Sequence, residues 1–242
     1  MSRYLLEVSY LGTNYSGFQI QLNANTIQSE VEKALLILLK SKIQLTGSSR
    51  TDAGVHAKQN FFHFDFKSPI NTKSLYNLNA ILPSDIVVKS LVIVEDEFHS
   101  RFSAISREYQ YTISLTKNPF LNDRAYHYPY KLDFNILNEL SAYLLQQENY
   151  ISFSKKNTQV NNHICKLAIS NWVIQSDTII YNVKANRFLR GMVRSLVATM
   201  LSVSRNKKSM IEFKDFFKNP ITASAKFSAP AHGLSLVEVL YK

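Results

Sequence analysis

Two strand-like segments that follow each other with almost no connecting chain restrict the folds open to this sequence. Residues 164–174 and 178–185 are rich in Ile, Val, Trp and Tyr, and only a short turn around Ser176 and Asp177 joins them. Parallel neighbours need a long crossover, whereas antiparallel neighbours can be joined by a tight turn. Strands without intervening helices also argue against a doubly wound α/β fold. We therefore predict an α+β fold with a largely antiparallel central sheet flanked by helices.

Apolar residues recur with the period of a strand in some segments and with the period of a helix in others. Residues 3–10 and 107–115 alternate apolar and polar positions, as half-buried strands do. Asn25, followed by Gln28, is a plausible cap for the first helix. The other predicted strands are 42–46, 59–66, 85–95 and 234–240, and the predicted helices are 26–40, 72–81, 133–147, 187–203 and a short last helix capped by Ser209 and Glu212.

This succession of strands and helices divides the chain into two similar halves. The first predicted domain comprises residues 1–104 and carries a loop around Asp52. The second comprises residues 105–242 and is expected to complete a cleft that holds the active site between the halves.

The balance of charged residues favours a polyanionic partner. The chain has 28 Lys and Arg against 18 Asp and Glu, which gives a formal net charge of +10. Nucleic acid is the commonest partner of such a protein. A basic proteome without functional meaning is the alternative that charge alone leaves open.

Other features exclude several classes of protein. No apolar run approaches the ~18 residues that a membrane helix needs, and the first residues, MSRYLLEVSY, carry no signal-peptide pattern. Cys165 is the only cysteine, and the six histidines show no helical i, i+4 pair. We therefore expect a cytoplasmic protein with no intramolecular disulfide and no metal site.

The loop GSSRTDAGVHA, residues 47–57, has two interpretations. Asp52 and Gly54 are common turn formers, and an Asx turn between two strands would account for them. The loop is longer than a two-residue hairpin needs, however, and Arg50 lies two residues before the acid. A carboxylate beside a cation in a partly dry cleft stays ionised and can act as a nucleophile or a base.

Two further groups of residues can be read either as structure or as an RNA-binding surface. Arg187, Arg190 and Arg194 would share one face of the predicted helix 187–203, as a solvated face or as a ridge for phosphates. Tyr109 and Tyr111 share a face of one strand, either packed in the core or stacked on bases. Spacing alone does not decide between these interpretations.

Six blocks of this sequence are similar, in the same order, to motifs of one known family. They are SYLGTNYSGFQIQ (9–21), GSSRTDAGVHA (47–57), NAILPSDIVV (79–88), FHSRFSAISREYQY (98–111), VKANRFLRGMVRS (183–195) and APAHGLSLVEVLY (229–241). Together they resemble the tRNA pseudouridine synthases of the TruA family. The chain departs from the family's motifs at Leu11, where an Asp is usual, at Phe18, where a Trp is usual, at Ser48 and Ser49, where Ala and Gly are usual, and at Ser195, where an Asn is usual.

The resemblance implies a function and a set of site residues. Asp52 matches the family's catalytic aspartate, Tyr109 the tyrosine that stacks on the target base, and Arg194 the basic residue that pairs with the aspartate. Arg50 matches the arginine that helps to extrude the nucleotide, and Leu234 an apolar residue beside the base. The family isomerises uridine to pseudouridine at positions 38, 39 and 40 of the tRNA anticodon stem-loop. It works as a homodimer, without cofactor or metal.

Two alternatives to this function remain at this stage. One is a non-catalytic RNA-binding protein on the same fold, and the other is a pseudouridine synthase with a different RNA site. The sequence also leaves open whether Asp52 attacks the sugar at C1′, removes the C2′ proton or attacks C6 of the base.

Overall fold

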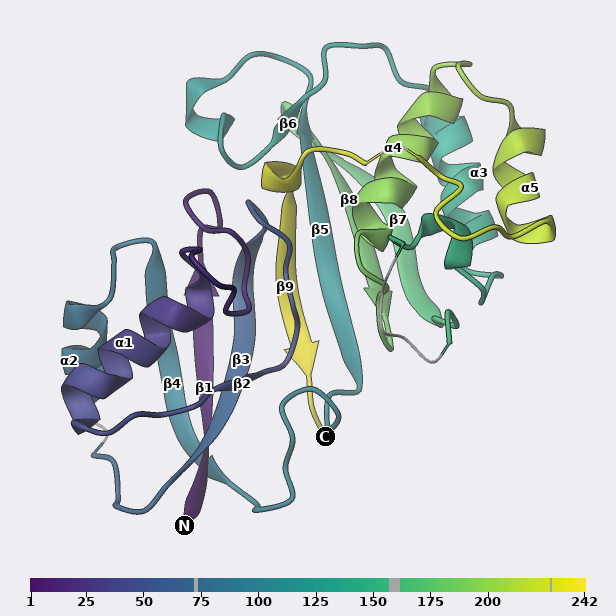
Figure 1. The fold of residues 1–242 in the computed structure, drawn as a ribbon. Coiled ribbons are helices and arrows are strands. Elements are labelled where there is room, and N and C mark those ends of the chain that lie inside the picture. Colours follow the sequence, from purple (N-terminus) through teal and green to yellow (C-terminus); the bar gives the residue numbers. More distant parts are fainter. Residues whose placement is uncertain (72–73, 157–161, 227) are drawn as a thin grey trace. The chain divides into compact units, whose positions relative to one another are not determined.

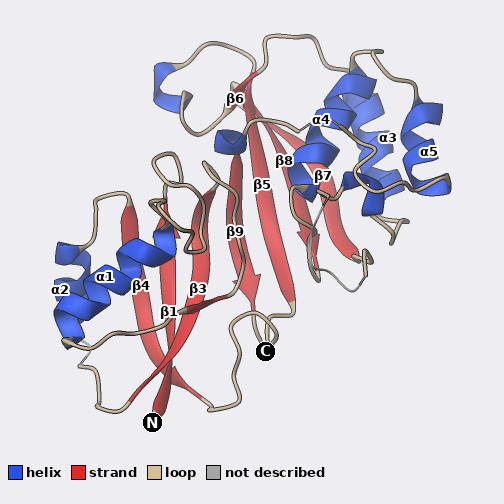
Figure 2. Ribbon diagram, viewed as in Figure 1, coloured by secondary structure: helices blue, strands red, loops and turns tan. Residues whose placement is uncertain are grey.

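Antiparallel pairing of neighbouring strands organises the chain, as predicted. The computed structural model describes residues 1–71, 74–156, 162–226 and 228–242. Contacts divide it into unit 1, Met1–Ile105 with Ser235–Lys242, and unit 2, Ser106–Leu234. Each unit combines helices with a sheet, so the predicted α+β class is confirmed (Figure 2).

The sheet of unit 1 is built on the first strand. β1 (Ser2–Tyr10) pairs antiparallel with β3 (His56–Phe66) on one side and with β4 (Ile86–Val94) on the other. The short β2 (Thr46–Gly47) pairs with β3, and α1 (Ile27–Leu39) and α2 (Ser74–Ile81) pack beside this sheet (Figure 1). The predicted helix 72–81 begins with two residues, 72 and 73, that lie outside the described residues.

The last strand returns to unit 1. β9 (Leu234–Leu240) has the predicted bounds and pairs in parallel with β3, with Ser235 opposite His56. Tyr241 extends this contact, because its ring packs against Phe61 and its hydroxyl donates to the carbonyl of Ser100. The C-terminal residues therefore group with the first half of the chain, whereas the sequence pattern had grouped them with residues 105–242.

In most of the segment 42–46, where a strand was expected, the main chain bonds to side chains of α1 instead of pairing with another strand. The amide of Gln28 donates to the carbonyl of Leu45 at 2.9 Å, and the N–H of Leu45 donates to Glu32 at 3.0 Å. Residues 42–45 are therefore not a strand, and that prediction was wrong. The predicted cap was also wrong by one residue. Thr26 and Ser29 form the capping box of α1, and the carbonyl of Asn25 instead accepts from the N–H of Ser16.

Unit 2 repeats the antiparallel pattern with its own helices. β8 (Thr178–Ala185) lies between β5 (Ser106–Ser114) and β7 (Leu167–Gln175), and β6 (Tyr126–His127) pairs in parallel with β5. Its helices are α3 (Phe134–Leu144), α4 (Met192–Ser204) and α5 (Met210–Lys218), with 3₁₀ turns at Pro119–Leu121, Ile151–Phe153 and Ala231–Gly233 (Figure 1).

Local interactions fix the ends of these helices. The predicted capping box of Ser209 and Glu212 is confirmed at the start of α5. α3 ends at Leu144, three residues before the predicted end, and the buried hydroxyl of Tyr150 donates to the carbonyl of Leu144 at 2.7 Å. That bond satisfies one of the carbonyls that every helix leaves unpaired at its C-terminus.

Helix α4 begins five residues later than the sequence pattern predicted. Gly191, at a φ of 74°, is its N-cap, and residues 187–191 precede the helix in a loop. The side chain of Asn186 fastens this loop, because it accepts from the N–H groups of Lys166 and Arg187. Arg187 and Arg190 are therefore not on one helical face with Arg194, and the shared face predicted for these three arginines was wrong.

The stability of unit 1 is expected to fall as pH decreases from 6.5 to about 4. His63 is 6% exposed, and burial together with nearby His99 and Arg3 lowers the pKa of its imidazole to about 4. Its Nδ1 accepts from the N–H of Ser100 at 3.2 Å, a bond that protonation breaks. Because the unfolded chain binds this proton first, the free energy of unfolding should decrease by about 2–3 kcal/mol over that range.

Urea unfolding at pH 7 and at pH 4.5 measures this dependence. His63→Gln keeps an acceptor for Ser100 but does not titrate, so its stability should change less between the two pH values. The pKa of His99 is also lowered, mainly by burial, so a smaller dependence of the same sign should remain. An equal change in wild type and variant would contradict this role of His63.

Candidate active site

The loop that carries Asp52 connects β2 with β3 in unit 1. It ends in a turn in which the N–H of Val55 donates to the carbonyl of Asp52 at 3.1 Å. Gly54, the third residue of this turn, has a φ of 77°, which a residue with a side chain rarely adopts. Asp52 is half-buried and Arg50 is exposed. The turn expected from the sequence is thus present, and the chain reverses its direction just after the candidate catalytic carboxylate.

A second loop, residues 11–21, holds the main chain on both sides of Asp52. The N–H of Phe18 donates to the carbonyl of Thr51 at 3.1 Å, and the N–H of Gly54 donates to the carbonyl of Tyr15 at 3.4 Å. At Gly17, with a φ of 112°, an added Cβ would lie 3.0 Å from the carbonyl oxygen of Thr51. The second loop therefore needs glycine there to approach the first so closely.

A buried polar network fixes the residues just before Asp52. The hydroxyl groups of Tyr10 and Thr51 are 2.8 Å apart. The amide of Asn60 donates to the Tyr10 hydroxyl at 3.2 Å and to the carbonyl of Ser49 at 2.8 Å. Because Asn60 and Tyr10 lie on β3 and β1, the sheet itself sets the position of the loop. Such support outside the reacting groups is what keeps a catalytic side chain in a productive geometry.

An aromatic contact occupies the space beneath the start of the loop. Phe18 stacks on Phe62 with ring centroids 4.4 Å apart, and a side chain at Gly47 would overlap the Phe18 ring. Phe18, which stands where the family has Trp, thus fills a closely packed position. Ser48 and Ser49 are buried, and their hydroxyl groups have no hydrogen-bond partner among the described residues.

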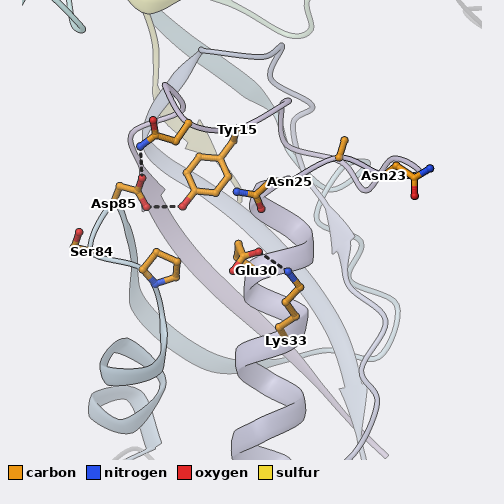
Figure 3. A pocket seen from close by; sticks show the side chains of 10 residues that line it. Tyr15, Asn23, Asn25, Glu30, Lys33, Ser84 and Asp85 are labelled. Atoms are coloured by element: carbon orange, nitrogen blue, oxygen red, sulfur yellow. Dashed lines mark hydrogen bonds and ion pairs between the residues drawn. The ribbon is translucent and has the colours of Figure 1, made fainter.

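A polar cavity of about 560 Å³ lies against the loop 11–21, and Figure 3 shows its side chains. Tyr15 donates to Asp85 at 2.5 Å and Asn14 donates to the same carboxylate at 3.2 Å. Burial, and then the bond to Asp85, raise the pKa of Tyr15 above its usual range. Asp52 does not line this cavity. We therefore assign these contacts to the support of the loop that in turn supports Asp52.

Tyr109 lies in unit 2, on β5. Its ring is 8% exposed and meets the ring of Phe188 edge to face, with centroids 5.1 Å apart. Tyr111 and Ile113, on the same face of the strand, are fully buried. Tyr111 and Ile113 therefore belong to the core, as one of the two interpretations predicted. Tyr109 is at the end of the buried stripe that these three residues form, next to the loop that precedes α4.

Arg194 and Tyr111 together hold the segment that leads into β9. The Nε of Arg194 donates to the carbonyl of Ala229 at 2.7 Å, and the N–H of Ala229 donates back to the carbonyl of Arg194 at 3.0 Å. The Tyr111 hydroxyl donates to the carbonyl of Pro230 at 2.9 Å. Leu234, which follows this segment, is 7% exposed. In unit 2 the structure thus places Arg194 beside the chain that positions Leu234.

The sequence patterns did not identify the residues that support the Asp52 loop or the residues around Arg194. Tyr10 and Thr51 lie within two of the motif blocks but were given no role there, and Asn60 lies outside the blocks. Only the presence of Asn60 in the apolar run QNFFHF could have indicated a buried polar contact. Ser195, the departure from the family's Asn, is buried and donates to the carbonyl of Ala225 at 3.2 Å.

The described residues contain neither a cluster of metal-ligating side chains nor a helix that could span a membrane. In residues 1–71, 74–156, 162–226 and 228–242, no three His, Cys, Asp or Glu side chains come together as metal ligands. No helix in these same ranges has both the length and the apolar character needed to cross a bilayer.

Comparison with known proteins relates the whole chain to one family. The family described as tRNA pseudouridine synthase matches residues 142–242. A protein of Azobacteroides pseudotrichonymphae named tRNA pseudouridine synthase A is 38% identical over 100% of this chain and 97% of its own length. Proteins of the same name from Parabacteroides distasonis, 38% identical over 100% and 96%, and from Bacillus pumilus, 37% identical over 97% and 97%, are similar to it as well.

Proposed function

Because the chain belongs to the tRNA pseudouridine synthase family, and is therefore an isomerase that acts on tRNA, we propose that it converts uridine to pseudouridine at positions 38, 39 and 40 of the anticodon stem-loop. The observation that carries this proposal is the construction of the Asp52 loop. The loop 11–21 and the buried Tyr10–Thr51–Asn60 network fix the main chain on both sides of a half-buried carboxylate. A simple turn between strands needs no such support.

Each candidate residue has a role in this proposal. Asp52 is the catalytic carboxylate, and Arg194 is the cation that pairs with it. Tyr109 stacks on the target base, Leu234 packs beside it, and Arg50 assists the extrusion of the nucleotide. The stacking role is supported by the place of Tyr109 at the end of the buried stripe of Tyr111 and Ile113, beside Phe188.

The reaction is an internal rearrangement. The N1–C1′ bond breaks, the uracil rotates, and a C5–C1′ bond forms while C5 loses a proton and N1 gains one. Substrate and product are isomers, so no co-substrate has to supply atoms or electrons, and the proposal includes no cofactor and no metal. The target base must first leave the stack, at a cost of a few kcal/mol, which stacking and phosphate contacts can offset.

The proposal extends to the state and the location of the protein. We infer that the chain acts as a homodimer in the cytoplasm, where tRNA is modified. The excess of Lys and Arg over Asp and Glu, 28 against 18, supports a polyanionic substrate.

Incubation of the purified chain with unmodified tRNA transcripts tests this function. Pseudouridine should form at positions 38, 39 and 40 of those transcripts that carry uridine there, without any added metal or cofactor. Chemical mapping of pseudouridine at each position measures it. Product at another position would indicate a synthase with a different RNA site, and tRNA binding without product would indicate a non-catalytic RNA-binding protein.

A further inference from the structure

A row of tyrosines leaves the buried sheet of unit 2 and reaches the surface. Tyr126 lies in β6, and its ring is followed by that of Tyr128 at 5.2 Å and then by that of Tyr130 at 4.9 Å from Tyr128. Tyr128 is 8% exposed, whereas Tyr130 is 46% exposed. The row therefore ends in an aromatic ring that is available to a partner.

Arg205 covers part of this row. Its guanidinium carbon lies 3.5 Å from the centre of the Tyr130 ring and 5.6 Å from that of Tyr128. Its Nη1 also donates to the Tyr128 hydroxyl at 3.3 Å. The cation–π contact and the hydrogen bond together fix the guanidinium in one orientation over Tyr130.

Hydrogen bonds anchor the main chain under this Tyr130–Arg205 pair. The N–H of Tyr128 donates to the carbonyl of Ser114 at 2.8 Å, which ties the row to the end of β5. Ser204, the last residue of α4, exchanges hydrogen bonds with the main chain of Asp133 at 2.7 and 3.1 Å. Both members of the pair are thus held in place before any partner binds, so little conformational entropy is lost on binding.

The surroundings of the pair are basic. Lys131, which follows Tyr130, and Lys207, two residues after Arg205, are exposed. Of the nearby acids, Asp123 pairs with Arg124 at 3.3 Å, and Asp133 caps α3 by accepting from two main-chain N–H groups. A rigid aromatic ring with an arginine over it and lysines around it is the composition of a surface for single-stranded nucleic acid.

We propose that the Tyr130–Arg205 pair is a second RNA-contact site, which stacks on an unpaired nucleotide of the tRNA away from the target uridine. The inference rests on the proposed function for its substrate. Arg194 lies in the first turn of α4 and Arg205 directly after the helix, so a rise of ~1.5 Å per residue separates them by about 16 Å along its axis. The pair therefore contributes to affinity for the RNA rather than to the chemical step.

Four variants test this site by their affinity for an unmodified tRNA transcript at one fixed salt concentration. Tyr130→Ala and Arg205→Ala should each raise Kd about tenfold, which corresponds to about 1.4 kcal/mol. Arg205→Lys keeps the charge but not the planar group, so it should lose most of the same affinity. Lys207→Ala, which removes a neighbouring charge without a stacked group, should change Kd by less than about threefold. The kcat at saturating tRNA should remain that of the wild type.

Other outcomes would overturn the site. Wild-type Kd in Tyr130→Ala and Arg205→Ala, with or without a lower melting temperature, would mean that the pair only supports the fold. If Arg205→Ala and Lys207→Ala lost equal affinity for tRNA and Arg205→Lys kept full affinity, Arg205 would contribute only its charge. A change of molecular mass in solution with unchanged tRNA affinity would assign the surface to contact with another protein copy. If the wild-type protein formed no pseudouridine, the proposed function would be rejected. The Kd values of the four variants would still show whether the Tyr130–Arg205 pair binds RNA.

Discussion

Replacing Asp52 with Asn is expected to lower kcat for pseudouridine formation by at least about 10⁴-fold, because the amide can neither attack carbon nor accept a proton as a base. The substitution is nearly isosteric. The bond that forms the turn runs from the N–H of Val55 to the main-chain carbonyl of Asp52, so it does not depend on the carboxylate. The loop should therefore persist, and Kd for tRNA should stay within about threefold of wild type. Single-turnover assays and binding to unmodified transcripts measure the two quantities.

An aspartate in another turn provides the matched control. Asp177 lies in the tight turn between β7 and β8, is exposed, and has no role in the proposed site. Asp177→Asn should keep wild-type turnover. Substantial activity in Asp52→Asn would remove Asp52 from its catalytic role, and a loss of both activity and tRNA binding would mean that the carboxylate mainly maintains the binding surface.

Much of unit 1 and unit 2 could be predicted because one period of apolar residues dominates most segments. β9 was predicted with its observed bounds since residues 234–240 form a short, mostly apolar run that follows a Gly. The failures come from interactions between distant residues. The segment 42–46 has strand-like residues, but the side chains of Gln28 and Glu32 bond its main chain to α1. The period of apolar residues carries no information about such side-chain contacts.

The beginning of α4 shows a second physical limit of sequence patterns. Phe188 and Leu189 fit the apolar face of a helix that continues through Leu196, so periodicity extended the helix to residue 187. Gly191 adopts a φ of 74°, which ends regular helix geometry there. Likewise, the motifs indicated Asp52, but the Tyr10–Thr51–Asn60 network that positions its loop is assembled from three separate segments. Its members become recognisable only when the sheet brings them together.

Arg194 is the second residue for which we expect a large effect; the structure shows one function for it, and we propose a second. Its Nε holds the carbonyl of Ala229, and its charge is proposed to act on the catalytic carboxylate. Arg194→Met removes both and should lower kcat at least about hundredfold, since an aspartate without its orienting cation is less well aimed at the reacting atom. Arg194→Lys keeps the charge and should recover part of this loss.

Tyr111→Phe distinguishes catalysis from a purely structural role of Arg194. It removes the neighbouring bond to the carbonyl of Pro230 and so loosens the same segment, 229–233, without removing a cation. An unsupported buried carbonyl costs about 1–3 kcal/mol, so the melting temperature should fall in both Tyr111→Phe and Arg194→Met. If the cation matters for the reaction, kcat should fall far more in Arg194→Met than in Tyr111→Phe at temperatures where both are folded. Equal losses of kcat would mean that both residues act only by holding the segment that leads to Leu234.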